Sequence, residues 1–434
     1  MRQLLAWKAS KHRKPLLLEG PRQVGKTWLL QEFGRQAYGN VAYMDFEATP
    51  SLTEIFDGDF DAPRIINQLQ LATGTRIVPG DTLIVFDEVQ ACPAALTSLK
   101  YFNERANEYH IACAGSLLGV ALQKDSSFPV GKVNFIPVNP LSFDEFLADR
   151  QPALADALKT RDWTLLAPFH NRLVGALRDY LFVGGMPEVV ARFAENGDYA
   201  EARLVQQDIL NAYDRDFSKH APPDEVPRIR AVWASIPRQL AKPQARFTYG
   251  ELGPGARGRT HGAAIEWLQQ AGVVMRVAQV SVPRLPLAGY VETTMFKLYL
   301  ADVGLLGALG QLDPSVIING NQAFTELRGA MTEQYAAMQL LDAFARVPNY
   351  WANDGGTAEV DFVVQRKQDI VPVEVKANRN LKAKSLAVYN EKYAPALSVR
   401  ASLAPYASHG TLVDLPLYAL SALPDLTVDL AVSP

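Results

Sequence analysis

The chain has 434 residues, a hydrophobic fraction of 48%, a charged fraction of 21% and a formal net charge of −3. These values are ordinary for a globular protein and exclude a disordered or fibrous chain. The nearly balanced charge creates no global field that would attract nucleic acid or an anionic membrane, so any such contact must come from local basic patches.

The cysteine content and the apolar runs indicate the compartment. Cys92 and Cys113 are the only cysteines, too few for a disulfide framework or a structural zinc site, which favours a reducing environment. The N-terminal apolar stretch is shorter than the core of a signal peptide, and no later run approaches the roughly 18 apolar residues of a membrane span. We therefore expect a cytoplasmic protein without a membrane partner.

The strongest motif is GPRQVGKT at Gly20–Thr27, which matches the pattern G-x-x-x-x-G-K-[ST]. The apolar run KPLLLE at Lys14–Glu19 leads into it, and a helical pattern follows it. Strand, loop and helix are the context that a phosphate-binding loop requires. We therefore predict that ATP is bound by the residues of this loop and the one that follows it, namely Gly20, Pro21, Arg22, Gln23, Val24, Gly25, Lys26, Thr27 and Trp28.

The residue types of the motif indicate separate roles. The glycines let successive backbone N–H groups face the phosphates, where the helix dipole adds partial positive charge. Lys26 is expected to reach the β- and γ-phosphates, and Thr27 to offer its hydroxyl to Mg²⁺.

A second strand pattern, DTLIVFDEVQ at Asp81–Gln90, ends in two adjacent carboxylates. Open α/β sheets bind ligands at such strand ends. We predict that Asp87 holds Mg²⁺ and that Glu88 acts as the general base for the attacking water. An apolar strand followed by Asp-Glu is by itself equally a plain strand terminus, and the upstream phosphate loop favours the functional interpretation.

Two further apolar runs, Val41–Phe46 and Ile111–Gly115, complete a parallel α/β sheet with helices on both faces. The second run ends at Ser116. This serine is predicted to sense the γ-phosphate, and a simple Gly-Ser turn is the alternative.

These motifs, with AGSLL and FPVGKVNFIPVNPLSFDEF, resemble one group of bacterial and archaeal AAA+ ATPases whose C-terminal part is catalogued as a domain of unknown function. The resemblance spans nearly the whole chain and also covers GGMPE and NAYDRDFSKH, for which we expect structural roles. It implies a homo-oligomer in which a basic residue from a neighbouring subunit completes the site. Lys132 stands at that place, where many relatives carry arginine, and a solvated loop lysine is the alternative.

The middle of the chain is predicted to be helical, with a break at Phe182–Pro187. Helical patterns at Arg228–Lys242, Phe247–Leu252 and Thr260–Gly272, followed by a hairpin, favour a winged helix. Its third helix would meet DNA phosphates through Arg257 and Arg259. The alternative is a fold that only bridges partners.

The last quarter contains a helix pattern at Leu327–Leu341 and strand patterns at Glu359–Val364 and Ile370–Lys376. A period of two places Glu374 and Lys376 on one strand face, with Asp361 on the neighbouring strand of a hairpin. Two such carboxylates can hold a second Mg²⁺ or Mn²⁺, and the lysine can position a water.

This arrangement resembles the PD-(D/E)xK nucleases, with Val360 in the place of the usual proline and with Glu333 as a further ligand from the helix. It implies a restriction-endonuclease-like α/β domain. Alternating Glu and Lys on a solvated strand is the alternative. The chain then continues with a basic stretch, which favours nucleic-acid binding. Solvated helix charges explain this stretch equally well. It contains Lys376, Arg379, Lys382, Lys384, Lys392 and Arg400, with Tyr389 and Tyr393 between them.

The sequence therefore predicts three domains, an AAA+-like ATPase at 1–148, a helical and winged-helix-like domain at 149–322, and a nuclease-like domain at 323–434. Three functions are consistent with them. The first is an ATPase coupled to a nuclease, and the second is an ATP-dependent regulatory switch with an inactive nuclease-like fold. The third is an ATPase that acts on a protein partner.

Overall fold

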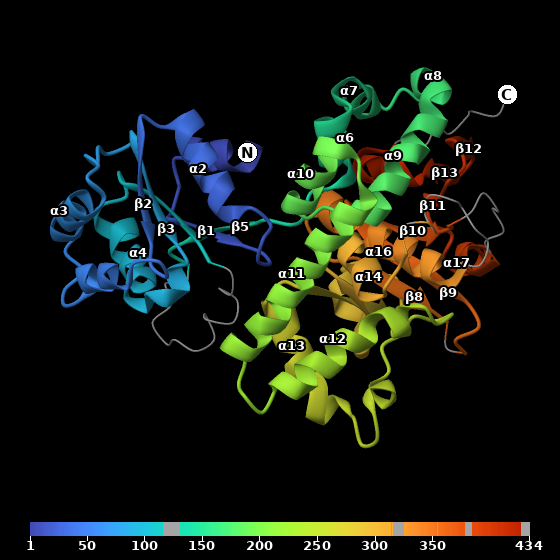
Figure 1. Ribbon diagram of the computed structural model, residues 1–434. Helices are drawn as coiled ribbons and strands as arrows, with labels where there is room; N and C mark the ends of the chain where they lie inside the picture. Colours follow the sequence, from blue (N-terminus) through green and yellow to red (C-terminus); the bar gives the residue numbers. More distant parts are fainter. Residues whose placement is uncertain (116–130, 314, 316–324, 354, 378–383, 427–434) are drawn as a thin grey trace. The chain divides into compact units, whose positions relative to one another are not determined.

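The computed structural model describes residues 1–115, 131–313, 315, 325–353, 355–377 and 384–426 (Figure 1). The chain divides into two compact units. Unit 1 comprises Met1–Asn139 and Gln270–Val273, and unit 2 comprises Pro140–Gln269 and Val274–Pro434.

Unit 1 is built on a five-stranded sheet in the order β2-β3-β4-β1-β5, in which every neighbouring pair is parallel. Because β1, β3 and β4 run parallel to one another, the loops that follow all three strands open at the same edge of the sheet. The parallel α/β sheet predicted from the sequence is confirmed. The strands are β1 (Leu16–Glu19), β2 (Asn40–Asp45), β3 (Thr82–Asp87), β4 (His110–Ala114) and β5 (Asn134–Pro137).

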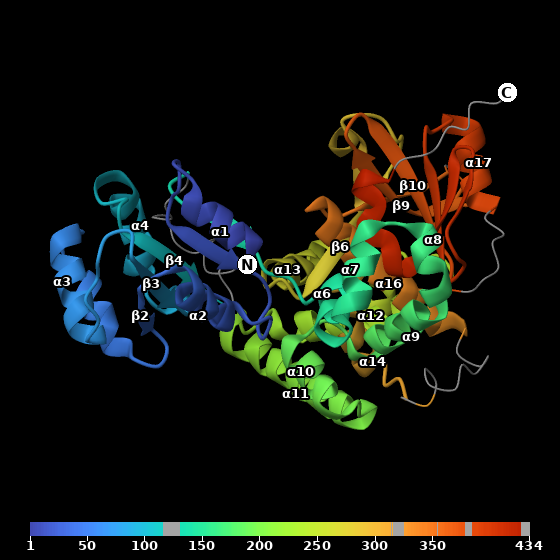
Figure 2. The ribbon, with the colours of Figure 1, turned by 90° about the horizontal axis from the view of Figure 1, so that it is seen from above.

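Helices cover both faces of this sheet (Figure 2). Alternate residues of β3 point to opposite faces, so Leu83 packs with α1 and α2 whereas Ile84 packs with α3 and α4. Both faces are therefore apolar, which explains why the strands read as continuous hydrophobic runs. The helices are α1 (Arg2–Ala9), α2 (Lys26–Ala37), α3 (Ala62–Thr73) and α4 (Pro93–Arg105).

Unit 2 combines helices with a mixed sheet. The predicted break is present, because α9 ends at Val183 and α10 begins at Pro187. The helices of this unit include α6 (Phe143–Arg150), α7 (Pro152–Thr160), α8 (Trp163–Leu166), α9 (His170–Val183), α10 (Pro187–Asn196), α11 (Tyr199–His220), α12 (Val226–Leu240), α13 (Gly258–Gln270), α14 (Val303–Leu309), α16 (Thr325–Phe344) and α17 (Lys384–Tyr393).

The sheet of unit 2 has eight strands in the order β12-β13-β11-β10-β9-β8-β6-β7. They are β6 (Val274–Val280), β7 (Val291–Leu300), β8 (Asn349–Ala352), β9 (Glu359–Arg366), β10 (Asp369–Val375), β11 (Ser398–Ser402), β12 (Ala407–His409) and β13 (Leu412–Pro416). The hairpin predicted as a wing, β6 and β7, joins this sheet through the parallel pairing of β6 with β8. The middle and C-terminal domains that we predict at 149–322 and 323–434 thus share one sheet, and the division between them stays a prediction.

Two helix predictions in the winged-helix segment need correction. The stretch predicted as a second helix forms only a 3-10 turn, Tyr249–Leu252, and the third helix begins earlier than predicted, at Gly258. Arg259 therefore lies in the first turn of α13 instead of before it. The winged helix itself stays a prediction.

The GGMPE segment has a steric reason for its glycines. Gly184 has φ 76°, and a Cβ there would lie 2.3 Å from Asp302 Oδ1. Gly185 donates its N–H to Asp302 Oδ2 at 2.6 Å, and a Cβ on it would lie 2.1 Å from the carbonyl oxygen of Leu141. The buried Asp302 also accepts the N–H of Leu305 at 2.9 Å, so one carboxylate joins the end of α9 to the start of α14.

We predict that Gly185→Ala destabilises the protein by about 1–3 kcal/mol, because the new methyl group must displace the backbone at Leu141. Gly175→Ala is the matched control, since it lies within α9 and a Cβ there meets nothing within 4 Å. The control should be stabilised by up to about 1 kcal/mol through helix propensity. Urea unfolding followed by circular dichroism measures both, and equal stabilities would contradict the steric account.

Candidate functional site

The phosphate loop of unit 1 depends on its two glycines. Gly25 caps α2 with φ 81° and ψ 24°, which is the left-handed region that glycine adopts without steric cost. Gly20 has φ 150°, and a Cβ there would lie 2.1 Å from the carbonyl oxygen of Val138. Gln23 also has a positive φ, 63°. The first turn of α2 therefore opens toward the loop, as phosphate binding requires.

Lys26 is the cation of this loop. Its side chain is only 7% exposed, and Nζ donates to the carbonyl oxygens of Gly20 at 2.9 Å and Pro21 at 2.6 Å. Burial lowers the pKa of Lys26 to about 8, while the nearby Glu88 and Asp87 oppose this shift. The ammonium thus lies within the loop, close to the backbone that would surround a phosphate.

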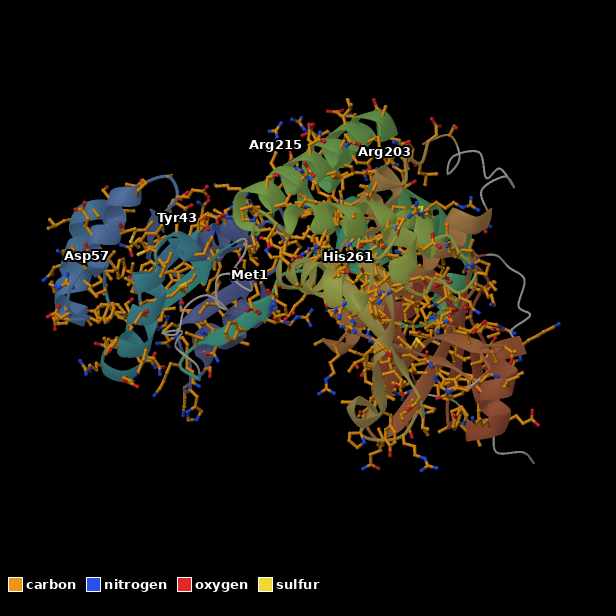
Figure 3. The ribbon with its side chains drawn as sticks, turned by 90° about the horizontal axis from the view of Figure 1, so that it is seen from below. Met1, Tyr43, Asp57, Arg203, Arg215 and His261 are labelled. Atoms are coloured by element: carbon orange, nitrogen blue, oxygen red, sulfur yellow. The ribbon has the colours of Figure 1, made fainter. Side chains whose placement is uncertain are left out.

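Asp87 connects the strand ends. Its buried carboxylate accepts the hydroxyl of Thr27 at 2.6 Å and the phenol of Tyr43 at 2.8 Å, both through Oδ2. Hydroxyl and carboxylate oxygens are the ligands that Mg²⁺ takes from proteins, so Thr27 and Asp87 fit the predicted metal. Sequence reasoning missed Tyr43 (labelled in Figure 3), although it lies two residues before Asp45, the register partner of Asp87 on β2.

Glu88 has a strained backbone, with φ 46° and ψ 44°. A left-handed residue other than glycine costs about 1–3 kcal/mol, and such strain often marks functional positions. The N–H of Glu88 donates to Asp87 Oδ1 at 3.0 Å, and the amide of Gln90 donates to Glu88 Oε2. Gln90, a second residue that sequence reasoning missed, therefore holds the carboxylate predicted as the general base.

The remaining predicted residues of this site differ in exposure. Trp28 is 66% exposed, Val24 is buried, and Arg22 forms an ion pair with Glu47 at 3.7 Å. Lys132 forms an ion pair with Glu104 of its own chain at 2.9 Å, which favours the solvated loop lysine over a role in a neighbouring subunit.

Ser116 lies outside the described residues. The strand that precedes it, β4, ends between β1 and β3. Its predicted sensing role stays a prediction.

The second cluster lies on the sheet of unit 2. The antiparallel pairing of β9 with β10 confirms the predicted hairpin. Asp361 Oδ2 accepts the N–H of Val375 at 2.7 Å, and Lys376 Nζ donates to Glu374 Oε1 at 2.6 Å. Glu374 is buried, and its Oε2 has no hydrogen-bond partner among the residues that the structure describes.

Charge interactions shift the pKa values in this cluster. Burial, followed by the charge of Glu374, raises the pKa of Asp361 well above its usual range. Burial also raises the pKa of Glu374, although Lys376 opposes the shift. The two carboxylates thus share an environment in which a cation is favourable.

Glu333, predicted as a further metal ligand, has other partners. Its Oε2 accepts the phenol of Tyr299 at 3.1 Å and lies 3.4 Å from Nζ of Lys297. The same ammonium is 2.6 Å from Glu359 Oε1. Burial by itself would lower the pKa of Lys297. The surrounding carboxylates outweigh this effect, so the pKa of Lys297 lies well above its usual value. Among residues 1–115, 131–313, 325–353, 355–377 and 384–426, no group of three or more His, Cys, Asp or Glu is arranged to hold a metal ion.

The basic residues predicted to meet nucleic acid are only partly available. Arg257 and Arg259 are exposed at the start of α13. Arg400 is bound to Asp414 at 2.6 Å, and Tyr389 is buried in the core. Lys384 and Lys392 are exposed, whereas Arg379 and Lys382 lie outside the described residues.

Three segments match known families. Residues 12–147 match the family described as AAA domain. This segment of unit 1 is therefore similar to AAA-type P-loop ATPase domains. Residues 174–316 and 328–420 match two domains of unknown function, DUF8612 and DUF4143. A comparison with curated protein sequences gives no match.

Three solved structures align with this chain at 16% identity. They are a Walker-type ATPase of Pyrococcus abyssi (71% of this chain and 94% of that chain, TM-score 0.45), the Aeropyrum pernix Orc1 protein in complex with DNA (73% and 91%, 0.29) and Cdc6p from Pyrobaculum aerophilum (74% and 94%, 0.26). Among the residues that the structure describes, no helix combines the length and the hydropathy that a membrane span requires.

The lowered pKa of Lys26 predicts a pH dependence of ATP binding. Above about pH 8 Lys26 loses its ammonium proton in the nucleotide-free loop. Binding of a nucleotide that needs the positive charge must then be accompanied by uptake of a proton by Lys26. The Kd for ATP should be nearly constant from pH 7 to 8 and then rise by up to about tenfold per pH unit. Calorimetry in buffers of different ionisation enthalpy should detect uptake of about one proton at pH 9. A Kd that stays constant to pH 9.5 would contradict this.

Proposed function

We propose that the chain binds ATP with Mg²⁺ and hydrolyses it at the carboxyl edge of the unit 1 sheet. The observation that carries this proposal is the hydrogen bond from Thr27 to Asp87, which joins the phosphate loop to the acidic end of β3. A glycine turn that matched the motif by chance would have no reason to face a buried carboxylate on another strand. The AAA domain match of residues 12–147 supports the same proposal.

The contacts of the side chains at this edge are consistent with separate roles in ATP binding and hydrolysis. Lys26 balances phosphate charge, because its contacts with the carbonyl oxygens of Gly20 and Pro21 hold a positive charge within the phosphate loop. Thr27 and Asp87 would hold Mg²⁺, which neutralises phosphate charge when it is bound. Glu88 accepts a proton from water, and Gln90 orients its carboxylate.

We predict that Glu88→Gln retains ATP binding and loses at least about 100-fold in kcat, because the amide cannot accept the proton. Lys26→Ala should instead abolish binding, since the loop then lacks its cation. Glu108→Gln is the control, because this exposed residue precedes β4 at the opposite edge of the sheet. A phosphate-release assay and an equilibrium binding assay separate the two effects, and undiminished turnover in Glu88→Gln would remove that residue from its role.

For unit 2 we propose a nucleic-acid partner and a nuclease-like, restriction-endonuclease-related domain. Exposed Arg257 and Arg259 support the partner, since phosphate contacts commonly use arginines near a helix start. The third function, action on a protein partner, needs no such surface.

The double variant Arg257→Gln/Arg259→Gln should weaken DNA binding. It should also reduce the slope of log K against log salt concentration by the amount that corresponds to about two phosphate contacts. Arg230→Gln is the control, because Asp214 holds that arginine at 2.7 Å. Fluorescence anisotropy at several salt concentrations measures the slope. If the parent shows no salt-dependent DNA affinity, the protein-partner function replaces this one.

Phosphodiester cleavage is a second candidate function, favoured by the closeness of Lys376 to Glu374 and by Glu374 Oε2, which no described residue hydrogen-bonds. In that case Glu374→Ala abolishes cutting of linear, branched or single-stranded DNA with Mg²⁺ or Mn²⁺. Absence of cutting on all substrates leaves the regulatory switch, in which ATP controls a module that binds without cutting.

A further inference from the structure

Lys297 is a buried lysine of β7 that no predicted function uses. Its side chain is 1% exposed, and Nζ lies 2.6 Å from Glu359 Oε1 and 3.4 Å from Glu333 Oε2. Tyr299, two residues further along β7, donates to the same Glu333 oxygen at 3.1 Å. The ammonium therefore bridges a helix carboxylate of α16 and a strand carboxylate of β9.

Charge balance explains why a cation is needed there. The cluster contains four acidic side chains and two lysines; they are Glu333, Glu359, Asp361, Glu374, Lys297 and Lys376. Buried carboxylates are costly unless a cation or hydrogen bonds compensate them. Lys376 is bound to Glu374, whereas Lys297 lies within ion-pair distance of both Glu333 and Glu359.

We propose that the ammonium of Lys297 takes the place of a metal ion between Glu333 and Glu359. The pocket thus has a permanent cation of its own, and Glu333 is held by Lys297 and Tyr299 instead of serving as a metal ligand. Only Asp361 and Glu374 are left for a divalent ion. In this proposal the helix carboxylate does not supply the further ligand that the sequence predicts.

Replacement of Lys297 by an uncharged side chain tests this role directly. Removing the ammonium while keeping the side-chain length leaves two facing carboxylates without a cation, and these oxygens suit a divalent ion. Lys297→Met should therefore create a metal site, whereas Lys297→Arg should not, because arginine keeps the charge.

The test uses the full chain with Asp87→Asn, which removes the metal-binding carboxylate of the ATPase site, and no nucleotide. MnCl₂ titration followed by electron paramagnetic resonance counts bound ions. Lys297→Met should bind one more Mn²⁺ per chain than its parent, and Lys297→Arg the same number as its parent. An unchanged count in folded Lys297→Met would overturn the proposal.

A second measurement applies if Lys297→Met is unstable. Mn²⁺ should then raise its melting temperature, because an ion that binds only the folded state stabilises it. The double variant Lys297→Met/Glu359→Gln lacks one of the two carboxylates and should show less than half of that rise. No rise in Lys297→Met, or an equal rise in both, would overturn the proposal. Neither measurement depends on ATP hydrolysis or DNA cleavage. Failure of the Lys297 proposal can therefore be distinguished from failure of the proposed function.

Discussion

The hydrogen bond of 2.6 Å between the hydroxyl of Thr27 and the carboxylate of Asp87 is the contact on which the account of this protein depends. It joins the first turn of α2 to the end of β3, although β4 lies between β1 and β3 in the sheet. Because Asp87 is buried and also bound by Tyr43, its position is fixed on two sides. The fixed carboxylate, hydroxyl and ammonium then form a compact group that suits a nucleotide with its metal.

Much of unit 1 could be predicted from the sequence, because its signals are local. A motif such as Gly20–Thr27 carries its own strand and helix on either side, and glycine marks the backbone conformations that other residues avoid. The hairpin of β9 and β10 was equally accessible, since the period of two in Glu374 and Lys376 needs no distant partner.

The supporting residues could not be predicted, because their roles arise only where distant strands meet. Tyr43 and Asp87 are 44 residues apart, and Lys297 and Glu333 are 36 apart. Neither Tyr43 nor Lys297 differs in its local pattern from an ordinary strand residue. The exposure of the basic stretch could not be predicted either, since Arg400 and Tyr389 look solvent-exposed in sequence but pack against Asp414 and the core. Burial is a property of the whole sheet, so composition alone misplaces such residues.

The measurement that tests the central claim most directly is calorimetric titration of the full chain with ATP, with and without Mg²⁺. We expect one nucleotide per chain, with affinity at least tenfold higher when Mg²⁺ is present, and loss of that metal dependence in Asp87→Asn. Absence of nucleotide binding by the folded chain in Mg²⁺, or the same metal dependence in Asp87→Asn, would contradict it.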